Sequence, residues 1–460
     1  MRAAPERFRY ARRAESRLER TTPSGDPVLV PQTSSVIKPA VRWALCGFMF
    51  VLLFETASIG LSVKPTLIFG ALLMLAAFSQ PAICFRRPPA AFWLFAAYLY
   101  FGMVGNVLSR TATRPDVLYQ YFVYVQLLIL FWITYNLFRY DGMPQRALLS
   151  LALSASIVAV LTLSGITHKT YDTGLASQRV SAFDSDPNNL AGLLALAFIG
   201  LVGITWAKGR PLLRSKLIAG ALAALIALFV LQTGSRGAMV ALVVGVMALS
   251  QSIGSASTRI RTFLVAAVLV GTFVVVGYNT PTIRLRFERT LQTGSMAKRE
   301  EIYPLAFQLF LKRPIFGWGV VTNTAQLASR LDAEGLMPPL TAPNGSYFKA
   351  THNMILYVLS ASGIMGTLPF LIGLWLCLRS AWKARRGSQG FLPFALALTV
   401  LLLDMSVDGH HWKQHWIFMA YALASGQLVM VRGKRAAIVP ESAAIDSVPQ
   451  RSRSHPGLAV

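Results

Sequence analysis

The chain has 460 residues, of which 54% are hydrophobic and only 14% are charged. A soluble globular domain carries about 25% charged residues, so this composition excludes a water-exposed globule. The net charge of +25 would suggest nucleic-acid binding in a soluble protein, but the long apolar runs favour a membrane protein, and no nucleic-acid partner is expected.

Apolar runs recur along most of the chain at a length that suits transmembrane helices. A hydrocarbon core of about 30 Å needs about 20 mostly apolar residues per helix. A β-barrel would instead show alternating segments of about ten residues. The sequence therefore predicts an all-α polytopic membrane protein with about 12 transmembrane helices, at residues 41–55, 65–80, 90–108, 117–138, 147–167, 188–206, 214–232, 237–252, 262–279, 352–380, 391–408 and 414–431.

The positive charges predict how these helices are oriented. The first 40 residues form a basic hydrophilic arm, and no small-residue cleavage site follows, unlike in a signal peptide. If this arm is cytoplasmic and the sides alternate, 28 of the 44 Lys and Arg residues lie inside, as the positive-inside rule requires. The arm at 1–40 and the tail at 432–460 are then both cytoplasmic, and the arm is expected near anionic membrane lipids.

One predicted outer loop, residues 281–351, separates nine helices over 41–280 from three over 352–431. A loop of this length is either functional or structured in its own right. We expect an amphipathic helix over 296–313, lying on the outer surface or capping a cavity, and an irregular remainder. The helix is indicated by apolar residues at helical spacing, namely Ile302, Leu305, Ala306, Leu309 and Phe310.

Polar clusters at the predicted outer ends of helices are the candidate sites, because a charge at membrane depth suggests function. The first is the turn from Thr233 to Gly237. Its glycines, Gly234 and Gly237, are expected to allow a tight turn and the close approach of a ligand. The hydroxyls of Thr233 and Ser235 and the guanidinium of Arg236 suit phosphate oxygens. The alternative is an arginine that merely reaches to the membrane surface from a helix end.

The second cluster runs from Arg179 to Asn189 and ends the outer loop before the sixth helix. Asp186 and Pro187 predict a helix start, with Asp186 as the N-cap and Pro187 in the first turn. Helix capping does not explain Asn188 and Asn189, whose amides suit sugar hydroxyls. Arg179 is a candidate for a further phosphate contact.

The third cluster is the dyad His352-Asn353, which opens the tenth helix. A neutral imidazole can take a proton from an attacking hydroxyl. Nearby arginines and the helix N-terminus are expected to lower the pKa of His352 and to favour that neutral form. The alternative is a structural hydrogen bond at the helix start. Deeper in the helix, Gly363 and Gly366 predict close helix packing.

No metal or cofactor is expected. His411 and His415 are four residues apart, but no glutamate follows the first histidine as in the HExxH zinc motif. Asp404 and Asp408, nearby, are candidates to pair with outer arginines. The three cysteines are far apart in apolar surroundings and indicate neither a disulfide nor a metal site; they are Cys46, Cys84 and Cys377.

Four motifs together carry a family resemblance. They are Thr-Gly-Ser-Arg236-Gly before an apolar helix, Arg313-Pro-Ile-Phe-Gly317-Trp-Gly319 in the long loop, His352-Asn-x9-Gly363-x-x-Gly366-Thr, and Asp186-Pro-Asn-Asn-Leu. With these motifs and twelve predicted helices, residues 40–430 resemble the O-antigen ligase and polymerase superfamily of bacterial envelope glycan assembly. The His-Asn pattern is similar to the hallmark of the ligase branch.

This resemblance implies a GT-C-like glycosyltransferase that needs no metal and acts at the periplasmic face of the bacterial inner membrane. The donor would be a glycan on undecaprenyl pyrophosphate, and the acceptor would be lipid A–core or a growing glycan. Arg236 and a second arginine in the long loop would bind the pyrophosphate. Arg299 is the candidate for the second arginine, with Arg289 as its rival, and His352 would be the general base or would orient the acceptor.

Three other functions stay open. A polymerase of the same superfamily would use the same motifs and differ only in its acceptor. A protein O-glycosyltransferase of similar architecture is a further possibility. A transporter or lipid flippase is less favoured, because such folds usually place polar or helix-breaking residues near the bilayer midplane, whereas the polar clusters here gather at one predicted face.

Overall fold

The computed structural model describes residues 37–55, 64–172, 178–183, 185–206, 215–251, 256–293, 299–336, 340–341 and 347–438. Its chain forms two compact units, one of residues Gln32–Gln427 and one of the two chain ends. Of the second unit, the described part is the last stretch of helix α17, up to Ile438. The predicted basic arm lies almost wholly outside the described residues, as does most of the tail.

A helix covers each of the twelve predicted apolar runs. These helices are α2 (Pro39–Val51) with η2 (Leu52–Phe54), α3 (Pro65–Phe78), α5 (Ala90–Leu108), α6 (Pro115–Phe138), α7 (Met143–Leu163), α8 (Pro187–Trp206), α9 (Lys216–Gln232), α10 (Arg236–Ser250), α11 (Ala256–Asn279), α15 (Met354–Ala384), α16 (Leu392–Asp404) and α17 (Lys413–Ile438). By length and composition, α5, α6, α7, α8 and α15 could cross a membrane, and six other apolar helices are shorter. The predicted helical fold class is therefore confirmed in the described residues apart from two short hairpins, while the number of about 12 spans stays a prediction.

Proline sets many of the helix starts. Pro39, Pro65, Pro115, Pro144 and Pro393 each stand in the first turn of a helix. In that turn the backbone N–H has no partner within the helix, and the fixed φ of proline already suits a helix. These starts are therefore dictated locally by the sequence.

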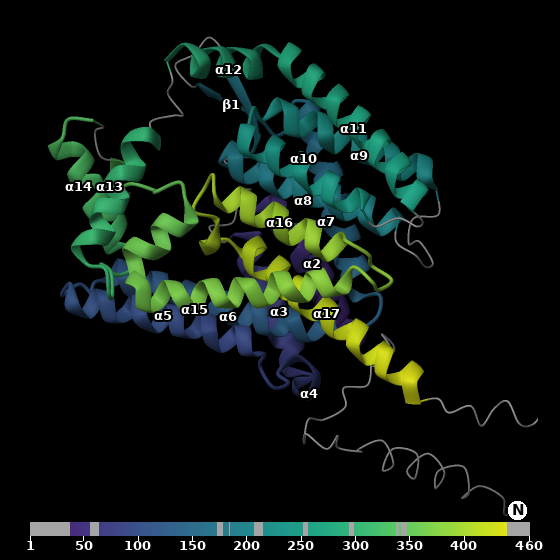
Figure 1. Cartoon of the computed structure of the whole chain (residues 1–460), viewed down its shortest axis with the longest axis horizontal. Helices are drawn as coiled ribbons and strands as arrows, with labels where there is room; N and C mark the ends of the chain where they lie inside the picture. Colours follow the sequence, from purple (N-terminus) through teal and green to yellow (C-terminus); the bar gives the residue numbers. More distant parts are fainter. Residues whose placement is uncertain are drawn as a thin grey trace, which may run out of the picture. The chain divides into compact units, whose positions relative to one another are not determined.

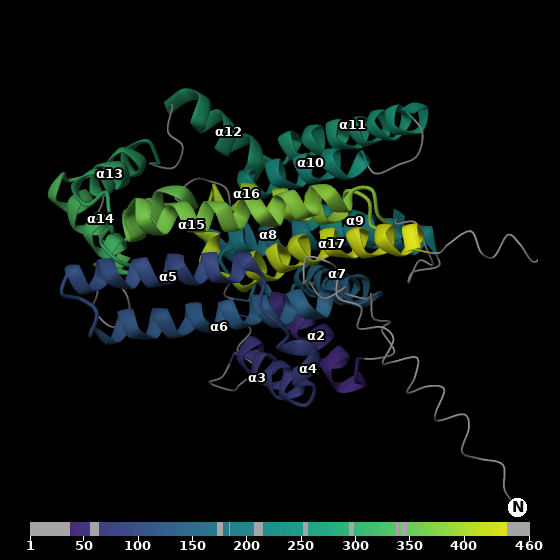
Figure 2. The same cartoon turned by 60° about the horizontal axis from the view of Figure 1, so that its bottom comes forward.

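The helices of the unit Gln32–Gln427 pack around an aromatic core. α5 and α15 run side by side, as both views show (Figures 1 and 2). Phe95 of α5 contacts Phe370 of α15, with ring centroids 5.7 Å apart, and Trp416 of α17, at 5.2 Å. All three rings are fully buried. Such interlocked side chains provide the van der Waals contact that holds helices together where lipid, not water, is the competing environment.

The predicted outer loop is more regular than expected. It contains α12 (Pro281–Thr293), α13 (Arg299–Lys312), α14 (Thr322–Ala333) and a short hairpin of β3 (Leu340–Thr341) and β4 (Tyr347–Phe348). The prediction of an irregular remainder is therefore wrong for α14 and this hairpin, whereas its proline- and glycine-rich parts, 337–339 and 342–346, lie outside the described residues. The loop between α7 and α8 holds a second unpredicted hairpin, β1 (His168–Asp172) with β2 (Gln178–Ala182). The connection between α16 and α17 holds the short η3 (Gly409–His411).

The apolar face predicted for 296–313 exists in α13, but it contacts protein. Ile302, Leu305 and Leu309 are buried against Leu327 and Leu331 of α14 in a small separate core. Figure 2 shows α13 and α14 together beside the start of α15. The periodicity of the sequence predicts this helix, whereas only the fold shows that its apolar face packs against α14.

Residues 314–319 fill a break in α15. Gly363 has φ +59° and interrupts the helix, and a Cβ at this position would overlap the backbone of Ile315. Gly366 faces Phe101 of α5, so the predicted close packing of helices applies to Gly366, while Gly363 admits the loop. Four backbone hydrogen bonds join the two segments, from Trp318 N to Ser360 O, Gly319 N to Ala361 O, Ile364 N to Pro314 O and Met365 N to Ile315 O.

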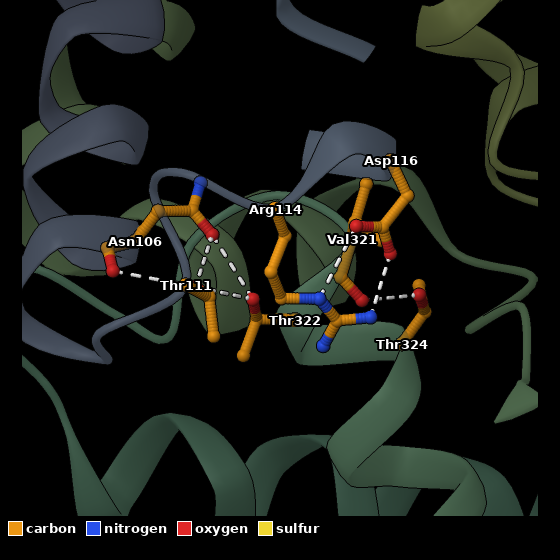
Figure 3. Close-up of polar contacts among 7 residues, drawn as sticks. All are labelled: Asn106, Thr111, Arg114, Asp116, Val321, Thr322 and Thr324. Carbon is orange, nitrogen blue, oxygen red and sulfur yellow. Dashed lines mark hydrogen bonds and ion pairs between the residues drawn. The ribbon is translucent and has the colours of Figure 1, made fainter. Parts of the chain in front are cut away.

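A polar network joins the start of α14 to the turn between α5 and α6 (Figure 3). The Thr322 hydroxyl donates to Oδ1 of Asn106 over 3.0 Å, and it lies 2.9 Å from the hydroxyl of Thr111. Beside them, Arg114 forms an ion pair with Asp116, with an N–O distance of 2.7 Å. Together with residues 314–319 in the α15 break, this network attaches the middle of the outer loop to α5 and α15.

Candidate active site

The turn that carries Arg236 is shaped by its own residues. Gly234 adopts φ +63°, which favours glycine, so the predicted tight turn is confirmed. The Thr233 hydroxyl is buried and donates to the carbonyl of Val230 over 2.7 Å, so it is engaged within the turn and not offered to phosphate as expected. Ser235 is also buried and precedes α10.

Gly237 has a protein neighbour on the side where a side chain would stand. A Cβ at Gly237 would stand 2.5 Å from Oγ of Ser406, just after α16. The close approach of a ligand at Gly237 stays a prediction. The lack of a side chain at Gly237 lets the start of α10 approach the end of α16, where Arg299 also binds.

Arg179 links the first hairpin to the Arg236 turn. Its Nε donates to the carbonyl of Thr233 over 2.9 Å, and its Nη2 donates to Oδ1 of Asn188 over 2.9 Å. The side chain is almost fully buried. Burial lowers the pKa of Arg179, the carboxylate of Asp186 raises it, and the charge of Arg236 lowers it. Arg179 thus lies close to Arg236 and holds its turn in place.

The helix start predicted at Asp186 is confirmed. Asp186 Oδ1 accepts hydrogen bonds from the N–H groups of Asn188 and Asn189, at 2.8 and 3.1 Å. The two amides then point to different partners. Asn188 binds Arg179, and Oδ1 of Asn189 accepts a hydrogen bond from Nε2 of Gln414 over 2.8 Å. Both are partly exposed, so donor atoms of both amides stand at the edge of the cluster.

Arg236 and Arg299 meet from separate elements. The guanidinium of Arg236 lies 5.9 Å from the ring centre of Phe287 on α12. The guanidinium of Arg299, at the start of α13, donates to the carbonyl of Ser406 over 2.7 Å. The two positive charges lie close enough to repel each other. The rival arginine, Arg289, lies in α12, and its side chain is outside the described residues.

His352 lies beside this cluster, just before α15. Burial lowers its pKa, Asp408 raises it, and the positive charges of Arg299 and Lys349 lower it; a smaller contribution from Asp186 raises it. The predicted direction is confirmed, although burial contributes most. A lowered pKa keeps the imidazole neutral near pH 7, which is the form that a general base requires.

Asp408, which the sequence offered only as a candidate partner for outer arginines, belongs to this site through other contacts. Its Oδ1 accepts hydrogen bonds from the Thr351 hydroxyl (2.5 Å) and from the N–H of Asn353 (2.9 Å), and its Oδ2 accepts one from the N–H of Thr351 (2.8 Å). It thereby binds the chain on both sides of His352. This role could not be predicted from the sequence, because Asp408 is far from His352 along the chain.

Asn353 caps α15. Its Oδ1 accepts hydrogen bonds from the N–H groups of Ile355 and Leu356, at 3.0 and 3.1 Å. This oxygen is therefore used in capping the helix. The side-chain N–H groups of Asn353 are the atoms that could contact a substrate. The capping also ties the helix N-terminus to the position of His352.

The two histidines considered for a metal do not share a helix face. His411 lies in η3, and the extended backbone of Trp412 separates it from the start of α17. His415 is buried and its Nδ1 lies 2.5 Å from Oδ2 of Asp404. The spacing argument is therefore wrong here, and in the described residues no group of three or more His, Cys, Asp or Glu side chains could hold a metal ion.

The described part of the chain thus brings Arg179, Arg236, Arg299 and His352 together at the ends of their helices and loops. Among the described residues, the charges that act on this group include Lys349, Asp186 and Asp408. Three guanidinium groups thus lie near one imidazole. Such an arrangement can bind a strongly anionic group and place a neutral imidazole beside it.

Residues 221–371 match the family model described as O-antigen ligase. The matched range includes Arg236, Arg299 and His352, and also the segment in the α15 break. None of the curated proteins compared matches the chain. The match supports an enzyme of the O-antigen ligase or polymerase type and a multi-pass membrane protein.

Proposed function

We propose that this chain, whose residues 221–371 match the family model described as O-antigen ligase, transfers a glycan from undecaprenyl pyrophosphate to a sugar hydroxyl of lipid A–core. The reaction takes place at the periplasmic face of the bacterial inner membrane and uses no metal ion. Undecaprenyl-pyrophosphate glycan, lipid A–core and membrane lipids are the proposed partners.

The observation that carries this proposal is the meeting of Arg236 and Arg299 beside His352. The two guanidinium groups lie close enough to repel each other and so concentrate positive charge at one place. A diphosphate is the kind of anion that such a place suits, and each guanidinium can bind it through two parallel hydrogen bonds. Such preorganised cations stabilise the charge that develops on the leaving group, often the largest contribution to catalysis.

The residues of this site suffice for a balanced reaction. Neutral His352 accepts the proton of the acceptor hydroxyl, whose oxygen attacks the anomeric carbon of the donor. The bond between that carbon and the pyrophosphate oxygen breaks, and its electron pair stays on the pyrophosphate, which Arg236 and Arg299 hold. The proton rests on His352, where the carboxylate of Asp408 stabilises the imidazolium. Attack opposite the leaving group inverts the anomeric carbon.

A polymerase of the same superfamily is the second candidate, because the same three residues would serve a growing glycan as acceptor. Deletion of the gene separates the two. Loss of capped lipopolysaccharide, with polymer still made on the lipid carrier, supports the ligase. Short chains on the lipopolysaccharide support the polymerase, and unchanged glycans would contradict both.

The site is tested with the purified full chain, undecaprenyl-pyrophosphate glycan and lipid A–core. We expect Arg236→Ala and His352→Ala each to lower transfer at least about 100-fold, with Arg236→Lys intermediate because lysine lacks the planar fork. Arg385→Ala is the matched control, since Arg385 lies at the end of α15 against Trp382. Full activity in the Arg236 and His352 variants would overturn the assignment.

A further inference from the structure

We propose that the acceptor sugar binds at the start of α17, on Trp412 and two polar side-chain pairs, Glu55 with Lys413 and Asn189 with Gln414. This inference rests on the proposed function, because it assigns the acceptor side of the same site. None of these four polar residues belongs to the arginine cluster, and only Asn189 was indicated by the sequence.

Three separate elements converge on this place. Lys413 Nζ forms an ion pair with Oε1 of Glu55, which follows η2. The next residue, Gln414, donates from Nε2 to Oδ1 of Asn189 in α8, over 2.8 Å. The side chains of Glu55 and Lys413 keep 28% and 26% of their surface exposed, so they are within reach of a ligand.

Two paths of contacts connect this place to the reacting groups. On one path, Asp408 acts on both His352 and His411: burial lowers the pKa of His411, and the charges of Asp408 and Glu55 raise it. His411 therefore lies near both Asp408 and Glu55, and Lys413 follows it by two residues along the chain. A sugar bound beside Lys413 would thus be on the side of the site where Asp408 holds the chain around His352.

The second path runs through the start of α8. Asn188 binds Arg179, which binds the Arg236 turn, and its neighbour Asn189 binds Gln414. The arginine cluster and the start of α17 are therefore linked through two adjacent amides at the start of α8. Asn188 contacts the arginine cluster and Asn189 contacts the start of α17.

The chemistry of the side chains suits a sugar and not a second anion. Sugar hydroxyls both donate and accept hydrogen bonds, and the two pairs offer a carboxylate, an ammonium group and the amide of Asn189, which the buried Gln414 holds in place. Lys413 is balanced by Glu55, so the pair carries no net charge that would favour an anion. Trp412, partly exposed and 5.4 Å from the ring of His411, supplies an apolar aromatic face of the kind that binding sites commonly place beside a few polar groups.

A purely structural role explains these pairs less well. An ion pair that keeps about a quarter of its surface exposed contributes little to folding stability. Nearby, the buried His415–Asp404 pair already fixes α17 to the end of α16. The position of Glu55 and Lys413 beside His411 is thus better explained by a ligand.

The test measures transfer by the purified full chain in lipid nanodiscs, with undecaprenyl-pyrophosphate glycan as donor and lipid A–core free of O-glycan as acceptor. We expect Trp412→Leu, Glu55→Gln and Lys413→Met each to raise the KM for the acceptor about tenfold, as the loss of one hydrogen bond or stacking contact would. The KM for the donor should change less than about twofold, because the arginine cluster is intact. Trp375→Leu, on the exposed side of α15, is the control and should change neither value.

A charge swap separates a ligand contact from a structural one. The double variant Glu55→Lys with Lys413→Glu keeps an ion pair but exchanges donor and acceptor positions. We expect its melting temperature to match the wild type while its acceptor KM stays raised. Recovery of the acceptor KM in the swap would show that the pair is only structural and would overturn the inference.

A binding measurement provides a readout that does not depend on activity. Core oligosaccharide released from lipid A is titrated against the intrinsic tryptophan fluorescence, and the change seen in the wild type should be lost in Trp412→Leu and kept in Trp375→Leu. An unchanged titration in Trp412→Leu would contradict the proposed subsite. If the wild type transfers no glycan to any acceptor, the proposed function fails; if it transfers but the subsite variants keep a normal acceptor KM, only this inference fails.

Discussion

Asp408 holds His352 from both sides, by accepting hydrogen bonds from the N–H groups of Thr351 and Asn353. His352 itself has φ +52°, a left-handed conformation that costs a residue with a side chain about 1–3 kcal/mol. Tyr303 adds a hydrogen bond from its hydroxyl to the carbonyl of His352, over 3.1 Å. The orientation of the imidazole is thus imposed by its neighbours, and Asp408 contributes most of the contacts.

We therefore expect Asp408→Asn to lower transfer about 10- to 100-fold, because charge-assisted hydrogen bonds contribute about 1.5–3 kcal/mol each. Glycan transfer by the purified variant measures the loss. Asp332→Asn, an exposed acid on α14, is the control. Equal activity of the two variants would show that Asp408 does not position His352.

The pH dependence of transfer should report His352. Burial lowers its pKa below the ordinary value of about 6.5, and the general base must be neutral. Transfer should therefore rise with pH, with its half-maximum below pH 6.5. Because the charge of Asp408 raises this pKa, the residual activity of Asp408→Asn should reach its half-maximum at a still lower pH. A rate profile from pH 4.5 to 8 measures both shifts, and a half-maximum above pH 7 would contradict the assignment.

Gly363 is expected to be essential for folding. A side chain there would be strained at φ +59° and would overlap the backbone of Ile315, so Gly363→Ala should destabilise the protein by several kcal/mol, on the order of 2–4. Gly271→Ala is the matched control, because Gly271 lies in α11 with nothing within 4 Å of a Cβ, and alanine there should be neutral or stabilise by up to about 1 kcal/mol. Thermal melting in detergent compares them. Similar melting temperatures would mean that residues 314–319 do not occupy the α15 break.

The buried pair of Asp404 and His415 should matter for stability and not for chemistry. Breaking a buried pair leaves one polar group without a partner and costs about 3–5 kcal/mol. Asp404→Ala should therefore lower the melting temperature strongly. Glu288→Gln, in the half-exposed pair with Arg284, should change stability by less than about 0.5 kcal/mol. The prediction fails if the two variants melt alike.

Transfer should not require a divalent ion. Arg236 and Arg299 supply the positive charge that a metal would otherwise bring to the diphosphate. Adding an excess of EDTA to the purified chain should leave the rate within about twofold of the untreated value. A loss that magnesium or manganese restores would disprove the metal-free reaction.

Local patterns in the sequence were enough to place the helices and the polar clusters. An apolar run of helical length, opened by proline as at Pro115 or capped as at Asp186, has only one favourable structure, because its backbone must satisfy its own hydrogen bonds. Arg236 and His352 stand out in the sequence because they are polar residues at the ends of such apolar runs. The turn at Gly234 was likewise predictable, since glycine accepts a positive φ at low cost.

The tertiary structure alone decided which of these groups meet and what each one does. Asp408 reaches Thr351 across 57 positions of the chain, and residues 314–319 fill a break that nothing near Gly363 announces. The Thr233 hydroxyl turns inward, and His411 and His415 leave a shared face because the backbone is extended between them. Periodicity records how each segment faces its surroundings, whereas contacts between distant segments depend on how the helices pack, and no single segment carries that information.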